Sequence, residues 1–135
     1  MNDDYREKFF SFLLKKNCTS KQAEEFLLRS KFPHEIIAPL ISEAQDMGLI
    51  DDLSFAKLFI EGHLHWGNAK IIYELSSKGI TKQKIYEALE DSEDENSRAY
   101  KLFETFKKQG LEDKKIMNRL LSRGFSLKSI NSCRR

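Results

Sequence analysis

Apolar residues recur at helical spacing along the whole chain, and the pattern repeats itself. Residues 68–89 and 113–134 align at a fixed shift of 45, which places Leu75 opposite Leu120. A fainter copy at residues 20–41 aligns with the first of these segments at a shift of 48. A period of 45–48 residues predicts a tandem array of small helical units. Such a unit cannot bury its apolar face alone, so neighbouring units must stack.

Capping residues mark the ends of the predicted helices. Thr19 with Gln22 forms a capping box, and Asp51 or Asp52, Thr81 and Ser126 suit helix starts. Five glycines that follow apolar runs suit the left-handed residue after a helix: Gly48, Gly67, Gly79, Gly110 and Gly124. The pattern predicts nine helices, near residues 4–16, 20–30, 34–47, 52–65, 68–78, 82–90, 94–109, 113–123 and 127–133.

These helices group into three three-helix units, spanning residues 1–48, 49–91 and 92–135. The first helix of each unit carries an aromatic stripe. The second and third helices are joined by a tight Lys-Gly or Arg-Gly turn, similar to a helix-turn-helix connection. The acidic run at residues 90–95 is expected to be a solvated hinge that also begins the next helix.

Composition agrees with an all-α fold, since the chain has two prolines and no valine. The net charge is +2, but positive and negative residues are distributed unevenly along the chain. Residues 1–95 carry 12 Lys and Arg against 18 Asp and Glu, whereas residues 96–135 carry 11 against 3. An acidic body with a basic end favours a polyanionic partner, although a merely soluble surface is the alternative.

Motifs for catalysis or for binding metals and cofactors are missing from the sequence. The chain has no glycine-rich phosphate loop, no GxSxG and no HExxH. His63 and His65 would point to different faces of one helix, so they do not form a metal site. We therefore expect no catalytic residue, no metal and no cofactor. Trp66, the single tryptophan, suits packing between helices or, alternatively, contact with a partner.

Cys18 and Cys133 lie near opposite ends of the sequence without a CxxC pair, which favours free thiols in a reducing cytosol. The longest uncharged stretches are too short to span a bilayer, and the acidic start does not suit a signal peptide. A cytoplasmic protein that does not bind membranes is the expectation.

Basic residues cluster in the second and third units. Lys70 and Lys115 are equivalent under the shift of 45, as are Lys78 and Arg123. Equivalent residues of stacked units face the same side, and a row of cations suits a polyanion without regard to sequence. The predicted binding residues are Trp66, Lys70, Lys78, Lys82, Lys115, Arg119, Arg123 and Lys128.

Three short motifs carry a family resemblance. They are Gly48-Leu49-Ile50-Asp51-Asp52 followed by Phe55-Ala56, then Lys78-Gly79-Ile80, then Arg123-Gly124-Phe125. In this order and spacing the chain resembles the RecX family, regulators of the bacterial recombinase RecA, over about residues 7–132. The resemblance implies three tandem three-helix units in a curved, elongated monomer. It also implies binding to RecA filaments and DNA, with inhibition of filament growth, ATP hydrolysis and strand exchange, and no catalysis by the chain itself.

The chain departs from the family pattern in two informative places. Lys31 stands where the other copies have Gly79 and Gly124, and His63, His65 and Trp66 follow Gly62 where an arginine-rich run is usual. Fewer cations release fewer counterions, so we expect weak binding to single- and double-stranded DNA. The main hypothesis is a RecA regulator; the alternatives are a stand-alone DNA-binding helical protein without sequence specificity, or an enzyme.

Overall fold

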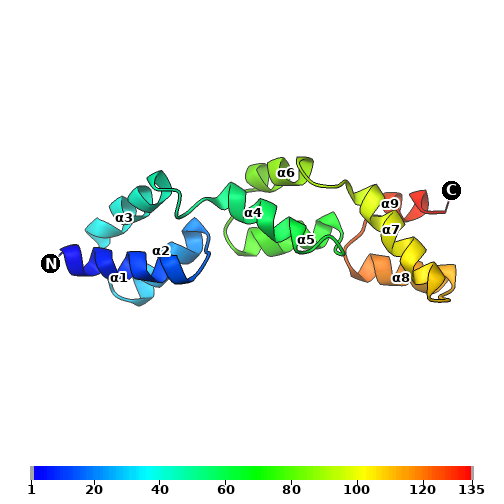
Figure 1. Ribbon diagram of the computed structural model, residues 1–135, viewed down its shortest axis with the longest axis horizontal. Helices are drawn as coiled ribbons and strands as arrows, with labels where there is room; N and C mark the ends of the chain where they lie inside the picture. The colour runs from blue at the N-terminus through cyan, green and yellow to red at the C-terminus, as the bar shows by residue number, and fades with distance from the viewer. Residues whose placement is uncertain (1, 135) are drawn as a thin grey trace.

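The structure is a computed structural model that describes residues 2–134, and this range contains nine α-helices and no β-strand. Contacts between helices divide them into three groups of three. Figure 1 shows these groups in a row, with the two termini at opposite ends of an elongated molecule. The predicted all-α array is therefore confirmed. The helices are α1 (Asn2–Lys15), α2 (Ser20–Arg29), α3 (His34–Asp46), α4 (Asp52–Glu61), α5 (Asn68–Ser77), α6 (Lys82–Glu90), α7 (Glu95–Lys108), α8 (Asp113–Ser122) and α9 (Leu127–Ser132).

Local capping signals determine most helix ends, as predicted. The Thr19 side chain accepts from the Gln22 N–H at 3.2 Å and completes the capping box, and Asp51 accepts from the Ser54 N–H at 3.0 Å. Thr81 and Ser126 begin α6 and α9 in the same way. Left-handed φ values of 75° to 92° occur at Gly48, Gly79, Gly110 and Gly124.

Two predictions at the α4–α5 turn are wrong. The expected helix 52–65 ends at Glu61, because the chain turns at Gly62, where the helix is capped. Gly67 does not follow a helix in a left-handed conformation: its φ is −78°, and it is the residue that precedes α5. A glycine is needed at this position because the main chain after α8, at Gly124 and Phe125, packs closely against it.

Each group of helices has its own hydrophobic core. The three clusters of buried residues draw on residues 9–50, 56–88 and 99–133 respectively. The helix pairs with the most extensive contacts lie within one group, such as α4 with α6 and α7 with α9. The chain is therefore a row of small cores linked by limited junctions, while the exact unit boundaries at residues 48 and 91 stay a prediction.

Cys18 and Cys133 are buried free thiols in two different cores. The acidic run is not simply a solvated hinge. Asp94 begins α7 by accepting from the Ser97 N–H at 2.8 Å, but the Glu95 side chain turns into a junction between two groups. In the part of the chain that the structure describes, no helix is long and apolar enough to cross a membrane.

Candidate functional site

The middle helices of the three groups meet end to end along the long axis of the molecule (Figure 1). Where α2 begins, the hydroxyl of Thr19 donates to the carbonyl oxygen of Lys78, at the end of α5, over 2.7 Å. The side chain of Lys21 covers Gly79, where an added Cβ would lie 2.4 Å from the Lys21 Cβ. We call this contact the first joint.

The same contact recurs one group further along, between the start of α5 and the end of α8. The Gly67 N–H donates to the carbonyl oxygen of Arg123 over 2.8 Å, and the Ala69 N–H donates to that of Gly124 over 3.3 Å. An added Cβ on Gly124 would lie 2.7 Å from the Cβ of Lys70. In this second joint Arg123 takes the place that Lys78 has in the first, so the structure confirms that these two cations are equivalent.

An acidic residue at the start of the following helix group completes each joint. In the first joint Asp52 accepts from the N–H of Ser20 at 2.8 Å and from its hydroxyl at 2.7 Å. In the second joint Glu95 accepts from the N–H of Asn68 at 2.7 Å. Both carboxylates thus satisfy the first free N–H of a middle helix, where the helix dipole also favours negative charge.

Glu95 is held more extensively than Asp52. The hydroxyls of Ser126 and Ser129 each donate to it over 2.7 Å, in addition to the Asn68 N–H. Burial alone would raise the pKa of Glu95, but the hydrogen bonds from Ser129, Asn68 and Ser126 outweigh it and lower the pKa below its usual value. Glu95 therefore stabilises the second joint in its ionised form.

Arg98 is a buried cation at the second joint that sequence reasoning missed. Its side chain is 2% exposed. Its guanidinium donates to the carbonyl oxygens of Trp66 and Glu93 and to the side-chain oxygen of Asn68. Burial lowers its pKa, and the nearby carboxylates, Glu95 foremost, oppose that shift. The only sequence signal was a cation in the first turn of a helix that follows an acidic run.

Beside the second joint, the turn between α4 and α5 gathers an aromatic cluster, which we define as Phe59, His63, His65 and Trp66. Phe59 and His63 stack with ring centroids 4.0 Å apart, and His63 lies 4.3 Å from Trp66 at 37°. The Nδ1 of His63 lies 2.7 Å from the Phe59 carbonyl oxygen, so it donates its proton there. Trp66 is half-buried against the second core, whereas His65 is exposed.

Three of the predicted cations surround this aromatic cluster. The Lys70 ammonium lies 4.3 Å from the Trp66 ring centroid, and that of Lys78 lies 5.5 Å from the Phe59 centroid. The Arg123 guanidinium donates to the His65 carbonyl oxygen over 3.4 Å. Partial burial, with Arg123, His63 and Lys70 nearby, lowers the pKa of His65. The structure thus joins Trp66, Lys70, Lys78 and Arg123 in one positively charged area.

The other predicted cations lie outside that area. Lys82 and Lys128 are exposed in the first turns of α6 and α9. Lys115 is exposed on α8, and the Arg119 guanidinium lies 5.3 Å from the Phe106 ring centroid. In residues 2–134 no group of three or more His, Cys, Asp or Glu side chains is placed to hold a metal ion.

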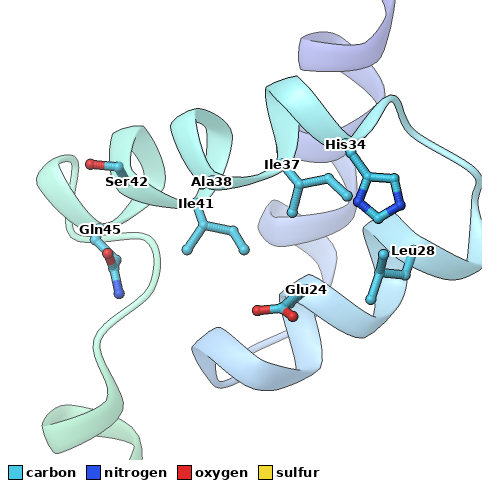
Figure 2. A pocket seen from close by; sticks show the side chains of 8 residues that line it. All are labelled: Glu24, Leu28, His34, Ile37, Ala38, Ile41, Ser42 and Gln45. Atoms are coloured by element: carbon cyan, nitrogen blue, oxygen red, sulfur yellow. The ribbon is translucent and has the colours of Figure 1, made fainter.

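A groove of about 440 Å³ between α2 and α3 is lined by none of these cations. Figure 2 shows Leu28, Ile37 and Ile41 along it, together with the polar side chains of Glu24 and His34. Five of its lining positions recur, at the shift of 48, in a groove of about 320 Å³ beside α6. The two grooves are a consequence of the repeat, and they do not coincide with the predicted site.

The fold and the joints define a class of protein: a tandem array of three-helix groups with cations repeated at its junctions. Solved structures share this fold. RecX from Lactobacillus salivarius matches with a TM-score of 0.84 and 22% identity, covering 97% of this chain and 92% of that one. Another structure, of regulatory protein RecX, matches with a TM-score of 0.80 and 20% identity, covering 98% of this chain and 70% of that one.

Sequence relatives agree with the structural ones. Regulatory protein RecX of Caldanaerobacter subterraneus subsp. tengcongensis is 28% identical over 126 residues, which are 90% of this chain and 64% of that protein. Regulatory protein RecX of Clostridium perfringens is 31% identical over 125 residues, which are 84% of this chain and 59% of that protein. No protein-family model matches the chain. The chain belongs to the RecX family of regulatory proteins, and it spans less than two thirds of the length of these two relatives.

Proposed function

We propose that this chain regulates the RecA recombinase by binding its nucleoprotein filament, and that it inhibits filament growth, ATP hydrolysis and strand exchange. The repeated joint carries the proposal, because it presents Lys78 and Arg123 from equivalent places in consecutive helix groups. A filament is a repeating structure, so cations repeated along an elongated chain are complementary to it. The family, whose members are named as regulatory proteins, supports the same role.

The proposed contact surface comprises the eight predicted residues: Trp66, Lys70, Lys78, Lys82, Lys115, Arg119, Arg123 and Lys128. Its cations would meet carboxylates of RecA, phosphates of DNA, or both. Binding to bare single- and double-stranded DNA is proposed to be weak and independent of sequence, since few cations gather in one place. The role requires no catalysis or cofactor, and we propose that the chain acts as a cytoplasmic monomer.

A stand-alone DNA-binding protein is the second candidate, and the aromatic cluster with its surrounding cations favours it. Aromatic rings interleaved with cations are typical of surfaces that bind nucleic acid. The two candidates differ in what they require of RecA. A RecA regulator is retained on RecA filaments more strongly than on the same DNA without RecA, whereas a stand-alone DNA binder is retained equally on both.

The test is a charge reversal at the two equivalent cations, Lys78→Glu with Arg123→Glu. Both joints depend on the main-chain carbonyl groups of these residues, so the substitutions leave those hydrogen bonds in place. We expect a folded protein that no longer inhibits DNA-dependent ATP hydrolysis by RecA, because two attractive contacts become repulsive. Circular dichroism checks the fold, and a hydrolysis assay with RecA on single-stranded DNA measures the inhibition.

The matched control is Arg29→Glu with Lys108→Glu. These exposed cations lie in the last turns of α2 and α7, whereas Lys78 and Arg123 occupy the C-cap positions of α5 and α8. The change in net charge is therefore the same, and all four substitutions place a negative charge at a helix C-terminus. We expect the control to inhibit like the unmodified chain. A folded Lys78→Glu, Arg123→Glu variant with full inhibition would remove this surface from the RecA site, and an unmodified chain without any effect on hydrolysis would refute the proposed function.

A further inference from the structure

The geometry points to a binding site for an unpaired nucleobase at the turn between α4 and α5, with the indole of Trp66 as the stacking surface. The site lies within the proposed contact surface, so the inference rests on the nucleic-acid part of the proposed function. It names the form of nucleic acid that the surface prefers, a single strand, and the physical interaction that selects it.

The indole is supported from within the protein. Phe59, partly buried against the second core, stacks on His63 at 4.0 Å with an interplanar angle of 22°. The hydrogen bond from His63 to the Phe59 carbonyl oxygen holds that imidazole in place, and His63 in turn lies 4.3 Å from Trp66. Arg98 further anchors the Trp66 main chain by donating to its carbonyl oxygen. A ring held in this way keeps its orientation when a ligand arrives, which lowers the entropic cost of binding.

A second neighbour of the indole is a side chain that can move away. The Lys70 ammonium lies over the ring at 4.3 Å, on a flexible four-carbon chain. Lys70 is half-buried, and a cation–π contact that water still reaches is weaker than the stacking of a base on an aromatic ring. A base can therefore displace Lys70, whose ammonium then meets the phosphate of the same nucleotide.

Further positive charge surrounds the position that the strand would take. Lys78 lies on the Phe59 side of the cluster, and Arg123 reaches it from α8 through the His65 carbonyl oxygen. The lowered pKa of His65, caused by partial burial and then by Arg123, His63 and Lys70, is consistent with this positive potential. A phosphate backbone is attracted to such a place, and the exposed His65 ring offers a second aromatic surface next to the first.

Base stacking distinguishes single strands from duplexes. In a duplex each base is paired and covered on both faces, whereas in a single strand a face can be offered to the indole at low cost. Electrostatic contacts alone would not make this distinction, because both forms carry phosphates. Stacking on the aromatic cluster would thus add to the attraction between the cations and the phosphates of a single strand.

Trp66 is the only tryptophan, so its fluorescence reports directly on the site. The probe is an oligothymidylate of about twelve nucleotides, within the range that single-strand binding surfaces cover. An abasic oligomer of equal length carries the same phosphates without bases, and a duplex of equal length carries paired bases. We expect the oligothymidylate to quench the indole and to bind about tenfold more tightly than the abasic oligomer. Equal affinity for the two would overturn the inference.

Variants locate the interaction, with affinity measured by the anisotropy of a labelled oligomer. Trp66→Leu is expected to lose the preference for bases while retaining the weaker binding of the abasic oligomer. Tyr100→Leu, which removes a 48% exposed aromatic ring on α7, is expected to keep the preference. If Trp66→Leu unfolds, Lys70→Met provides the test instead. This variant retains the indole but lacks the ammonium group, so we expect the preference for the oligothymidylate over the abasic oligomer to persist while the affinity for both falls. Loss of the preference in Lys70→Met would contradict the inference.

Inhibition of RecA separates this inference from the proposed function. If the oligothymidylate shows no preference over the abasic oligomer but the chain still inhibits ATP hydrolysis by RecA, only the stacking site is wrong. If the preference is present but the chain leaves RecA unaffected, the proposed regulatory function is wrong and the nucleobase site remains.

Discussion

The second joint leaves no room for a side chain at residue 67. The φ of Gly67 is −78°, which any residue adopts, so Gly67→Ala introduces no conformational strain. Its Cβ, however, would lie 2.1 Å from the Gly124 carbonyl carbon and the Phe125 nitrogen, and 2.2 Å from the Gly124 oxygen. All three are main-chain atoms that cannot rotate away. To reach an ordinary contact distance of 3.4 Å, α5 and the end of α8 must separate by more than about 1 Å.

Such a separation disrupts the hydrogen bonds of the second joint. The bonds from the N–H groups of residues 67 and 69 to Arg123 and Gly124 lengthen beyond a useful range. Each is worth about 1 kcal/mol net, and overpacking costs about 1–3 kcal/mol. We therefore expect Gly67→Ala to lower the free energy of unfolding by about 3–5 kcal/mol, a large fraction of the stability of a small domain.

Chemical denaturation measures the loss, and hydrogen exchange at the amides of residues 67 and 69 locates it. Gly62→Ala is the matched control in the same turn: its φ is −82°, and its Cβ would meet only carbonyl oxygens of α4 at 3.6 and 3.7 Å. We expect the control to be neutral or to stabilise the chain by about 0.4–1 kcal/mol. If Gly67→Ala matches Gly62→Ala in both measurements, the close packing of the second joint is refuted.

Two further predictions concern the separate cores and the acid stability of the second joint. Leu75→Ala and Leu120→Ala remove fully buried side chains, so each should lower the free energy of unfolding by about 2–5 kcal/mol. The loss of hydrogen-exchange protection should be confined to the helix group that carries the substitution and to the adjacent group. A uniform loss of protection along the chain would indicate one shared core. The lowered pKa of Glu95 contributes stability that is present above the unfolded carboxyl pKa of about 4.3 and is lost as the pH falls through the folded value. Glu95→Gln should therefore flatten the acid side of a stability–pH curve, and an unaltered curve would count against the role of this carboxylate.

Part of the site could be predicted from the sequence. The repeat made Lys78 and Arg123 equivalent, and the joints confirm that equivalence. The clustering of Lys70 with Trp66 could not be predicted in the same way, because it depends on a turn that begins four residues earlier than expected. Arg98 was missed since a buried arginine differs from an exposed one only in what packs around it.

The sequence by itself determined the helices and the number of their repeats. Capping hydroxyls, carboxylates and left-handed glycines act within a few residues, so their effect does not depend on the remainder of the fold. The capping box at Thr19 and Gln22 and the start of α6 at Thr81 are local in this sense, and both were predicted correctly.

Only the tertiary structure decided what several of these residues do. Gly79 and Gly124 pack against the middle helix of the preceding group, whereas Lys31, at the equivalent place after α2, is exposed and takes a φ of 61° despite its side chain. Gly67 and Glu95 likewise acquire their roles from chain segments about 30 or more residues away. Contacts between repeats depend on how whole helices pack, and the pattern within any one repeat does not specify that packing.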